Sequence, residues 1–367
     1  MWQTIKEEAE AEKVNLLLVF GGRETLAQTD CFEDIQRDFP NADIVYSSTS
    51  GEILDSEIHN NSISVTGIQF KDTRLKAERV NIQTSGGRYQ AGAQLAEALN
   101  AEDLRIILVF SEGKNVNGSE LVCGLNDHLP THIPVTGGLA GDGTNFQMTT
   151  TGLNERPAED NVVAIGLYGD SLQVGFGYYG GWKAFGPYRK VTKSKGNVLY
   201  ELDGKSALAL YKSYLGDRAA ELPTSGLLFP LAVCPEGKGD APVRTLLDVN
   251  EEEQSLTFAG EIPLGSQVQL MKSNFDDLID AAGIAAEKSV EKMGDFEAEL
   301  AILISCVGRK LVLDQRVEEE VEEVRAVLGK NSCITGFYSY GEISPGGNLL
   351  SCELHNQTMT ITTLAEK

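Results

Sequence analysis

The stretch LLLVFGG at residues 16–22 begins a pattern that occurs three times along the chain. Each copy has an apolar, strand-like run, a helix-like stretch and a second apolar run that ends in a glycine followed by an acidic residue. The first apolar runs are 16–20, 106–110 and 301–305, and the glycine-acid corners are 50–52, 140–142 and 340–342. Phe20 and Gly51 are 31 residues apart, as are Phe110 and Gly141. Strand–helix units place functional groups at the carboxyl ends of their strands, so the corners are the first candidates for a site.

The repeated units predict the fold class. Short continuous apolar runs bounded by glycine are typical of buried strands. The return strands and an acidic hairpin near 243–258 indicate mixed rather than purely parallel sheets. We therefore expect an α/β (α+β) protein of mixed sheets with flanking helices. The segment 217–240 is interrupted by prolines and glycines, which predicts two domains, 1–221 and 222–367.

Composition excludes several classes of protein. The chain has 367 residues and a net charge of −23, which argues against nucleic acid and anionic membranes as partners because both need basic surfaces. No apolar run approaches the roughly 20 residues of a membrane helix, and residues 1–13 are too polar for a secretory signal. The six cysteines form no CxxC pair. Buried thiols in a reducing compartment explain them, so we expect a cytoplasmic protein.

The repeat extends beyond the corners. Residues 58–65 align without gaps on residues 354–361, and each segment contains a His-Asn pair, His59-Asn60 and His355-Asn356. The second unit has Glu159-Asp160 in place of this pair. The first and third units are therefore the more similar two.

Several of these segments resemble the FIST family. Residues 137–142 and 191–208 are similar to its N-terminal half, and residues 242–244, 307–310, 336–343 and 355–358 are similar to its C-terminal half. The resemblance covers nearly the whole chain in the expected order. It implies FIST N-terminal-like and C-terminal-like domains in a ligand-sensing module of bacterial signal transduction.

The resemblance also implies ligands and partners. Amino acids or small carboxylates are the expected ligands. Family members are often fused to output domains, but no residues remain for one after Leu364. We therefore expect a separate signalling partner such as a histidine kinase, diguanylate cyclase or chemoreceptor.

The corner of the third copy has the most candidate ligand-binding side chains around it. Tyr338 and Tyr340 share one face of a strand, and aromatic, hydroxyl and carboxylate groups suit a small amphiphilic ligand. Arg309 follows a central strand, where it can clamp a carboxylate or form a salt bridge. The acidic residues of the corners can instead cap turns. The predicted ligand-binding residues are Arg309, Tyr338, Tyr340, Glu342, Ser344, His355 and Asn356.

Three alternatives remain open. Some relatives resemble haem-based nitric-oxide sensors, and His355 would then be the iron ligand. Cys306 could serve as the nucleophile of an enzyme if a base lowered its pKa. The chain could also be a purely structural interaction protein. We favour a protein that is not an enzyme and has no cofactor.

Other features have simpler explanations. His128 and His132 have the spacing of a zinc site, but Pro130 lies between them and breaks the helix, so no metal is expected. Trp182 is expected to cover the edge of a core, and the run Glu318–Glu320 to face solvent.

Overall fold

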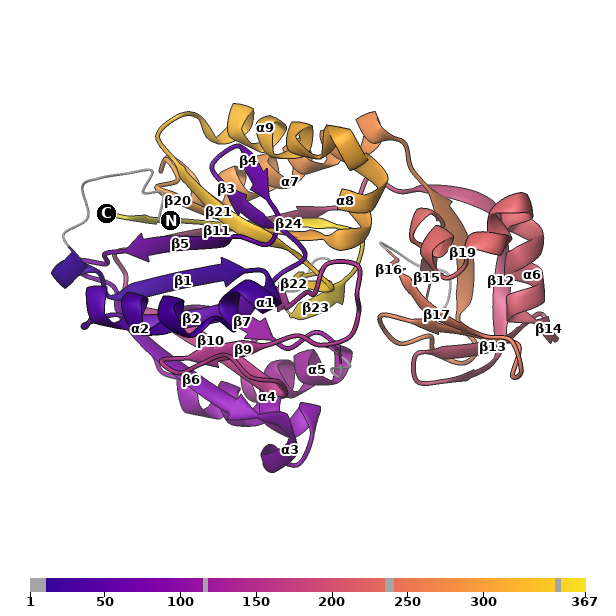
Figure 1. Cartoon of the computed structure of the whole chain (residues 1–367), viewed down its shortest axis with the longest axis horizontal. Coiled ribbons are helices and arrows are strands. Elements are labelled where there is room, and N and C mark those ends of the chain that lie inside the picture. Colours follow the sequence, from indigo (N-terminus) through magenta and orange to yellow (C-terminus); the bar gives the residue numbers. More distant parts are fainter. Residues whose placement is uncertain (1–10, 115–117, 235–240, 347–350) are drawn as a thin grey trace.

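A computed structural model describes residues 11–114, 118–234, 241–346 and 351–367. It consists of a large body, in which three sheets pack around a shared core, and a smaller lobe beside it (Figure 1). Strands and helices alternate along the body and the sheets are mixed, so the predicted α/β class is confirmed. Within the described residues, no helix combines the length and apolar character that a membrane crossing requires.

The three sequence units are three copies of one structural unit. In each, a first strand pairs in parallel with the return strand and antiparallel with a last strand. These strands are β1 (Leu16–Gly21), β2 (Asp43–Ser48) and β5 (Ile63–Ile68); β7 (Leu104–Ser111), β8 (Val135–Leu139) and β10 (Asn161–Tyr168); and β20 (Leu300–Cys306), β21 (Cys333–Ser339) and β24 (Met359–Glu366).

Helices connect the parallel strands, because such a connection must cross back over the sheet. The crossover helices are α1 (Arg23–Leu26) and α2 (Thr29–Asp38), α5 (Gly118–His128), and α8 (Val307–Leu313) and α9 (Val317–Leu328), with the 3-10 turn η5 (Asp314–Arg316) between the last two. The outer faces also carry η1 (Ala11–Lys13), α3 (Ile82–Ser85), α4 (Arg88–Leu99) and α7 (Phe275–Met293).

After each corner the chain leaves its own sheet and joins the next. Strand β3 (Glu52–Leu54) pairs with β21, β22 (Gly341–Pro345) pairs with β8, and β9 (Thr151–Leu153) pairs with β2. Strands β4 (Glu57–His59) and β23 (Cys352–His355) complete two of these hairpins. The exchange is cyclic, since the first unit gives a strand to the third, the third to the second and the second to the first.

Alternation along the first strands divides their side chains between two cores. One face points into the centre of the body, where Phe20 lies 5.7 Å from Phe110 and 4.8 Å from Phe337 between ring centroids. The opposite face packs under the helices; Val109, for example, contacts the core beneath α4 and α5. Burial on both faces explains why the sequence runs are continuously apolar.

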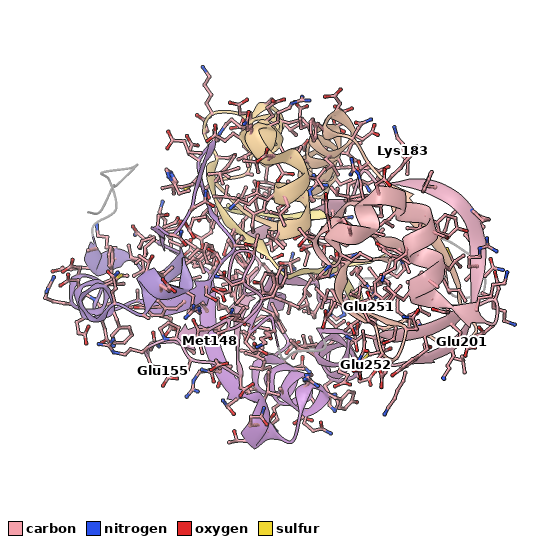
Figure 2. The ribbon with its side chains drawn as sticks, turned by 45° about the vertical axis from the view of Figure 1, so that its right-hand side comes forward. Met148, Glu155, Lys183, Glu201, Glu251 and Glu252 are labelled. Atoms are coloured by element: carbon pink, nitrogen blue, oxygen red, sulfur yellow. The ribbon has the colours of Figure 1, made fainter. Side chains whose placement is uncertain are left out.

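The small lobe is an insertion between β11 (Leu172–Tyr179), which pairs with β24, and α7. Its elements are β12 (Lys183–Lys195), β13 (Val198–Leu202), β14 (Lys205–Ser206), α6 (Ala207–Leu215), η2 (Gly216–Glu221), η3 (Thr224–Leu228), β15 (Leu231–Cys234), β16 (Val243–Arg244), β17 (Leu246–Asn250), β18 (Ser255–Phe258) and β19 (Gln267–Lys272). The body also contains β6 (Arg74–Asn81), which pairs with β10. Lys183, Glu201, Glu251 and Glu252 mark the surface of the small lobe in Figure 2.

The two structural parts differ from the expected division into 1–221 and 222–367. The boundary near residue 222 lies inside the small lobe, between η2 and η3. Strands from before this boundary, β3 and β11, complete a sheet with β20, β21 and β24. Of the segment 217–240, the described residues 217–234 belong to the small lobe, where Pro223 precedes η3 and Pro230 lies between η3 and β15; residues 235–240 lie outside the described residues.

Candidate functional site

A cavity of about 480 Å³, which we call the corner cleft, lies where parts of all three units meet. It is lined by residues 22–24, 49–51, 60–61 and 142–145 and by Val307, Lys310 and Leu311. The first segment follows β1, the second follows β2 and the last lies in α8 after β20. The cleft therefore lies at the carboxyl ends of the parallel strands, where ligands of α/β proteins bind.

Two cations line the corner cleft. The Arg23 guanidinium donates through Nε to Asp142 Oδ1 at 3.0 Å, and its side chain is 24% exposed. Lys310 Nζ donates to the Ser50 carbonyl oxygen at 2.5 Å and to Asn60 Oδ1. Burial lowers the pKa of Lys310, because an ammonium group loses hydration there. The cleft thus combines a half-buried cation, Lys310, with a separate ion pair.

Tyr340 supports the wall of this cleft. Its hydroxyl donates to the Gly143 carbonyl and accepts from the backbone N–H of Phe146. The Tyr340 ring stacks on the Phe146 ring, with the two centroids 4.5 Å apart. Tyr340 therefore fixes the loop that follows the second corner.

The acidic residues of the first and third corners have a structural role. Glu52 accepts hydrogen bonds from the Thr49 hydroxyl at 2.5 Å and the Ser62 hydroxyl at 2.6 Å. Glu342 accepts equivalent bonds from Ser339 at 2.6 Å and Thr358 at 2.8 Å. Both carboxylates are fully buried and hold the exchanged hairpins in place. Asp142 is the corner acid that lines the cleft.

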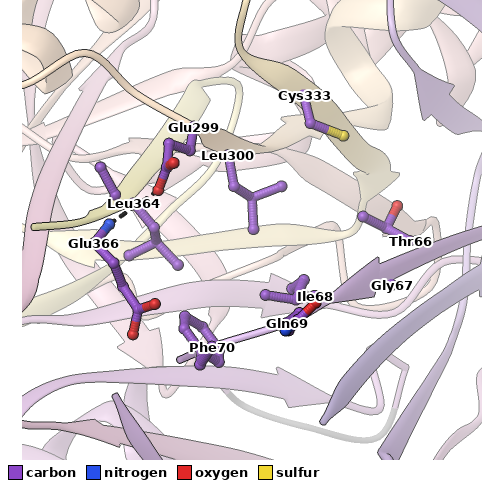
Figure 3. A pocket seen from close by; sticks show the side chains of 11 residues that line it. Thr66, Gly67, Ile68, Gln69, Phe70, Glu299, Leu300, Cys333, Leu364 and Glu366 are labelled. Atoms are coloured by element: carbon purple, nitrogen blue, oxygen red, sulfur yellow. Dashed lines mark hydrogen bonds between the residues drawn. The ribbon is translucent and has the colours of Figure 1, made fainter. Parts of the chain in front are cut away.

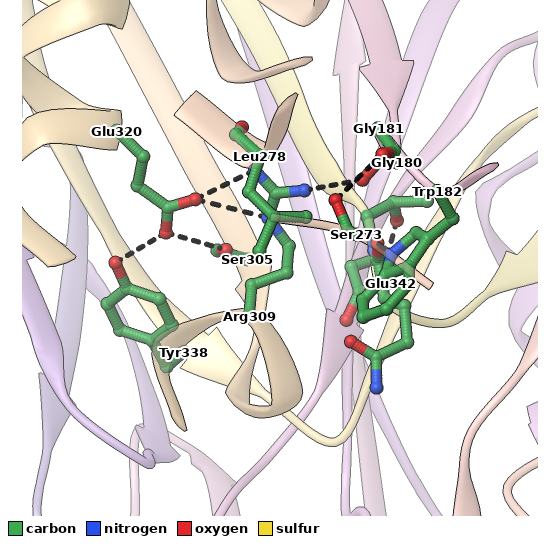
Figure 4. Close-up of polar contacts among 12 residues, drawn as sticks. Gly180, Gly181, Trp182, Ser273, Leu278, Ser305, Arg309, Glu320, Tyr338 and Glu342 are labelled. Carbon is green, nitrogen blue, oxygen red and sulfur yellow. Dashed lines mark hydrogen bonds and ion pairs between the residues drawn. The ribbon is translucent and has the colours of Figure 1, made fainter. Parts of the chain in front are cut away.

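Arg309 and Tyr338 belong to a buried network around Glu320 (Figure 4). Arg309 pairs with Glu320 at 2.8 Å and also donates to the carbonyls of Gly180 and Leu278. The Tyr338 hydroxyl donates to the same carboxylate at 2.6 Å. Burial raises the pKa of Tyr338, and the negative charge of Glu320 raises it further. The sequence left two roles open for Arg309, a clamp for a ligand carboxylate and a salt bridge. In the structure it forms the salt bridge, with Glu320. Glu320 is fully buried, so the prediction that the run 318–320 faces solvent is wrong at this residue.

His355, Asn356 and Ser344 lie around a different part of the body. His355 Nε2 is 3.2 Å from the Ser344 carbonyl oxygen, and its ring stacks on Tyr178 with centroids 4.1 Å apart. Burial lowers the pKa of His355 to about 4, which keeps the imidazole neutral. The Asn356 amide, which is buried, has no hydrogen-bond partner among the described residues.

His355 and Asn356 line a second cavity of about 330 Å³, the interlobe cleft. One wall comes from β11, α7 and residues 353–358 of the body, and the other from β12, β15, β19 and residues 241–243. Trp182 lines it too and donates from Nε1 to the Gln357 carbonyl at 2.7 Å. The seven predicted residues therefore do not share one cavity, because only His355 and Asn356 line either of these clefts; the other five, Arg309, Tyr338, Tyr340, Glu342 and Ser344, line neither.

Sequence reasoning missed Arg23, Lys310 and Asp142 as a group. A signal was present, since each first strand is followed within four residues by a basic residue, Arg23, Lys114 or Lys310. It also missed Tyr178, Tyr179 and Lys288 of the interlobe cleft, which come from strands and a helix without a recognisable motif.

The other candidate groups have ordinary environments. Cys306 is 2% exposed, and burial raises the pKa of its thiol, so the thiolate of a nucleophile is disfavoured. His128 Nδ1 lies 3.1 Å from the Gly124 carbonyl oxygen. Among the residues that the structure describes, no group of histidine, cysteine, aspartate or glutamate side chains could hold a metal ion.

A third cavity of about 230 Å³ opens at the opposite end of the strands (Figure 3). Phe70, Leu300 and Leu364 from the central core form its apolar part. Its acidic residue Glu366 already accepts the backbone N–H groups of residues 71–73. This cavity is therefore the open end of the core and offers no uncommitted carboxylate.

The Glu342 carboxyl predicts a dependence of stability on pH. Burial raises its pKa from 4.5 to about 8. The folded state therefore holds a proton that the unfolded state releases, and the free energy of unfolding falls as the pH rises from 4.5 towards 8. A tenfold change in proton affinity corresponds to about 1.4 kcal/mol, so the full loss for a pKa raised from 4.5 to about 8 is roughly 5 kcal/mol.

Urea unfolding between pH 5 and 8.5 measures this dependence. Glu342→Gln should flatten the curve relative to the wild type, whereas Glu318→Gln on the exposed face of α9 should not. Parallel curves for the wild type and Glu342→Gln would contradict the assignment.

Comparison with known proteins places the chain among its relatives. Residues 15–205 match the FIST N domain and residues 207–345 match the FIST C domain. The uncharacterized protein MJ1623 of Methanocaldococcus jannaschii is 28% identical over 270 residues, covering 66% of this chain and 51% of that protein. The chain thus spans about half the length of this relative.

Two solved structures are distantly similar to this chain. A chorismatase matches with a TM-score of 0.36 and 10% identity over 99% of this chain and 96% of that one. A cyanuric acid hydrolase from A. caulinodans matches with a TM-score of 0.20 and 12% identity over 80% of this chain and 99% of that one.

The two domain matches together cover most of the chain, in the order that the sequence predicted. FIST domains are sensory domains of signal transduction. The chain belongs to the FIST family.

Proposed function

We propose that this protein senses a small amino acid or carboxylate, which binds in the corner cleft, and passes the signal to a separate protein. One observation carries the proposal, namely the half-buried Lys310 ammonium group in the same cleft as the Arg23–Asp142 ion pair. Both signs of charge are thus available within one cavity of about 480 Å³. Polar groups of this kind fix the orientation of a ligand in an otherwise preformed pocket.

The charges favour a zwitterion over an anion. A ligand carboxylate near Lys310 would replace the hydration that this ammonium group has lost. A ligand ammonium group near Asp142 would share the Asp142 carboxylate with Arg23. Because the whole chain carries a net charge of −23, an amino acid is repelled less at long range than a dianion.

The cleft is well situated to affect the rest of the molecule. Its residues come from all three units, so a bound ligand would add a contact among units that already meet in the central core and through their exchanged hairpins. Helix α8, which carries Lys310, also packs against η3 of the small lobe. The proposed partner, a histidine kinase, diguanylate cyclase or chemoreceptor, would respond to the resulting change at the surface.

Isothermal titration calorimetry with the twenty amino acids, acetate and succinate tests the proposal. At least one amino acid should bind saturably, and Lys310→Met and Arg23→Gln should each weaken it by tenfold or more. Arg105→Gln is the matched control, because Arg105 lies on an exposed surface at the start of β7. Thermal unfolding of each variant checks that it remains folded.

Two results would overturn this proposal. One is the absence of binding by every compound in the panel. The other is an affinity that is the same in Lys310→Met as in the wild type.

The proposal includes neither an enzymatic step nor a cofactor. The buried Cys306 thiol supports this choice, since its raised pKa opposes nucleophilic attack. His355 Nε2, the expected ligand of a haem iron, is next to the Ser344 carbonyl. A haem titration followed by the Soret band, with His355→Ala as control, tests the haem alternative. A shift of the band that His355→Ala abolishes would replace the present proposal.

A further inference from the structure

We propose that the interlobe cleft is a second ligand site, which binds a planar aromatic monocarboxylate between the body and the small lobe. This site goes beyond the proposed function, because it shares no lining residue with the corner cleft. Its volume of about 330 Å³ falls within the range of small-molecule pockets.

Aromatic side chains form much of the body's wall. The Tyr178 ring lies on the neutral His355 imidazole, and Trp182 is held in place by its bond to the Gln357 carbonyl. Tyr179 is 41% exposed and Tyr188 of the small lobe is 55% exposed. Large aromatic side chains that stay exposed in a concave site indicate binding, and flat rings stack on them favourably.

One cation fixes the polar end of the ligand. Lys288 Nζ lies 4.6 Å from the Tyr179 ring centroid and 5.7 Å from that of Tyr178. A ring stacked on these tyrosines would place its carboxylate beside this ammonium group. Glu353 also lines the cleft and would repel a second carboxylate, which restricts the ligand to a single negative charge.

The junction of the two lobes runs along the cleft. The chain enters the small lobe through Gly180 and Gly181 and returns through Ser273, whose hydroxyl donates to the Gly181 carbonyl at 2.8 Å. Gly181 has a φ of +73° and a Cβ there would lie 2.3 Å from the Asp277 carbonyl oxygen, so this crossing requires glycine.

Away from the junction, the small lobe is docked on the body by few polar contacts. Arg244 Nη1 donates to the Leu354 carbonyl at 2.8 Å, and Gln357 Nε2 donates to the Leu227 carbonyl at 3.1 Å. A ligand that contacts both walls would therefore change how firmly the lobes are held together, as in hinge proteins that bind ligands between domains.

Trp182 provides a direct measurement. The chain has two tryptophans, and a Trp2→Phe background leaves Trp182 as the sole indole fluorophore. Titration with benzoate should quench or shift its emission saturably. Benzamide, which lacks the charge, and cyclohexanecarboxylate, which lacks the aromatic ring, should each bind at least tenfold more weakly. Calorimetry under the same conditions confirms that the signal reports binding.

Variants on one helix provide a matched pair. Lys288→Met should weaken benzoate binding tenfold or more. Lys292→Met, one turn further along α7, removes a lysine that lies over Phe176 and outside the cleft, and should leave binding unchanged. Equal effects of these two variants, equal binding of benzoate and benzamide, or no saturable binding would each overturn the proposal. Lys310→Met should not affect benzoate, so this site and the corner cleft can fail independently.

Discussion

Replacing Arg309 with methionine is expected to destabilise the fold by about 3–5 kcal/mol, the cost of removing one partner from a buried ion pair. The Glu320 carboxylate is fully buried and would keep only the hydroxyl donors of Ser305 and Tyr338. The carbonyls of Gly180 and Leu278 would also lose their donor. Chemical unfolding monitored by circular dichroism measures the change.

A second substitution separates the charge from the packing. In Arg309→Met/Glu320→Leu no charge is left buried, so most of the lost stability should return. A double variant as unstable as Arg309→Met would show that the guanidinium acts mainly through its bonds to the carbonyls of Gly180 and Leu278.

Replacing Gly137 with alanine is expected to destabilise the protein by about 3 kcal/mol or more, because strain and overpacking coincide there. Gly137 has a φ of +147°, and a Cβ at this position would lie 1.9 Å from the Val109 carbonyl oxygen. That oxygen belongs to the neighbouring central strand, which cannot move without disturbing the core. The same measurement of unfolding applies.

Two further glycines test the explanation. Gly336 occupies the equivalent position in the third unit, where an added Cβ would lie 1.8 Å from the Leu303 carbonyl oxygen, and Gly336→Ala should be similarly harmful. Gly67 lies in β5, and an added Cβ there would lie at an ordinary 3.4 Å from its nearest neighbour, a methyl group of Val14. Gly67→Ala should therefore change stability by less than about 1 kcal/mol. Comparable losses at Gly67 and Gly137 would contradict the steric argument.

The sequence allowed the repeated units to be predicted, because long apolar runs such as 106–110 have a strong periodic signal. The exchange of hairpins could not be predicted. Strand β3 has only three residues, and nothing in three residues specifies which sheet they join. The expected domain boundary near residue 222 falls inside the small lobe, because the proline- and glycine-containing turns of this lobe look like a linker in the sequence.

The candidate site was harder to predict than the fold. Sequence shows that Arg309 follows a central strand, but not that a glutamate eleven residues later is turned inward to meet it. Glu320 lies in an acidic run, where solvent exposure is the ordinary expectation. Conversely, His355 and Asn356 were selected from an internal alignment, and they line the interlobe cleft.

The cyclic exchange of hairpins has a consequence for how this chain acquires its structure. Phe337 in β21 is the partner of Glu52 in β3, so two neighbouring residues of one sheet are far apart in the order of synthesis. Until the last unit emerges from the ribosome, the first unit has no neighbour for its hairpin and leaves backbone groups open to other chains. Pairing across such separations slows folding. Completion of the body therefore depends on strands of the third unit, β21 and β24, which are made long after β3.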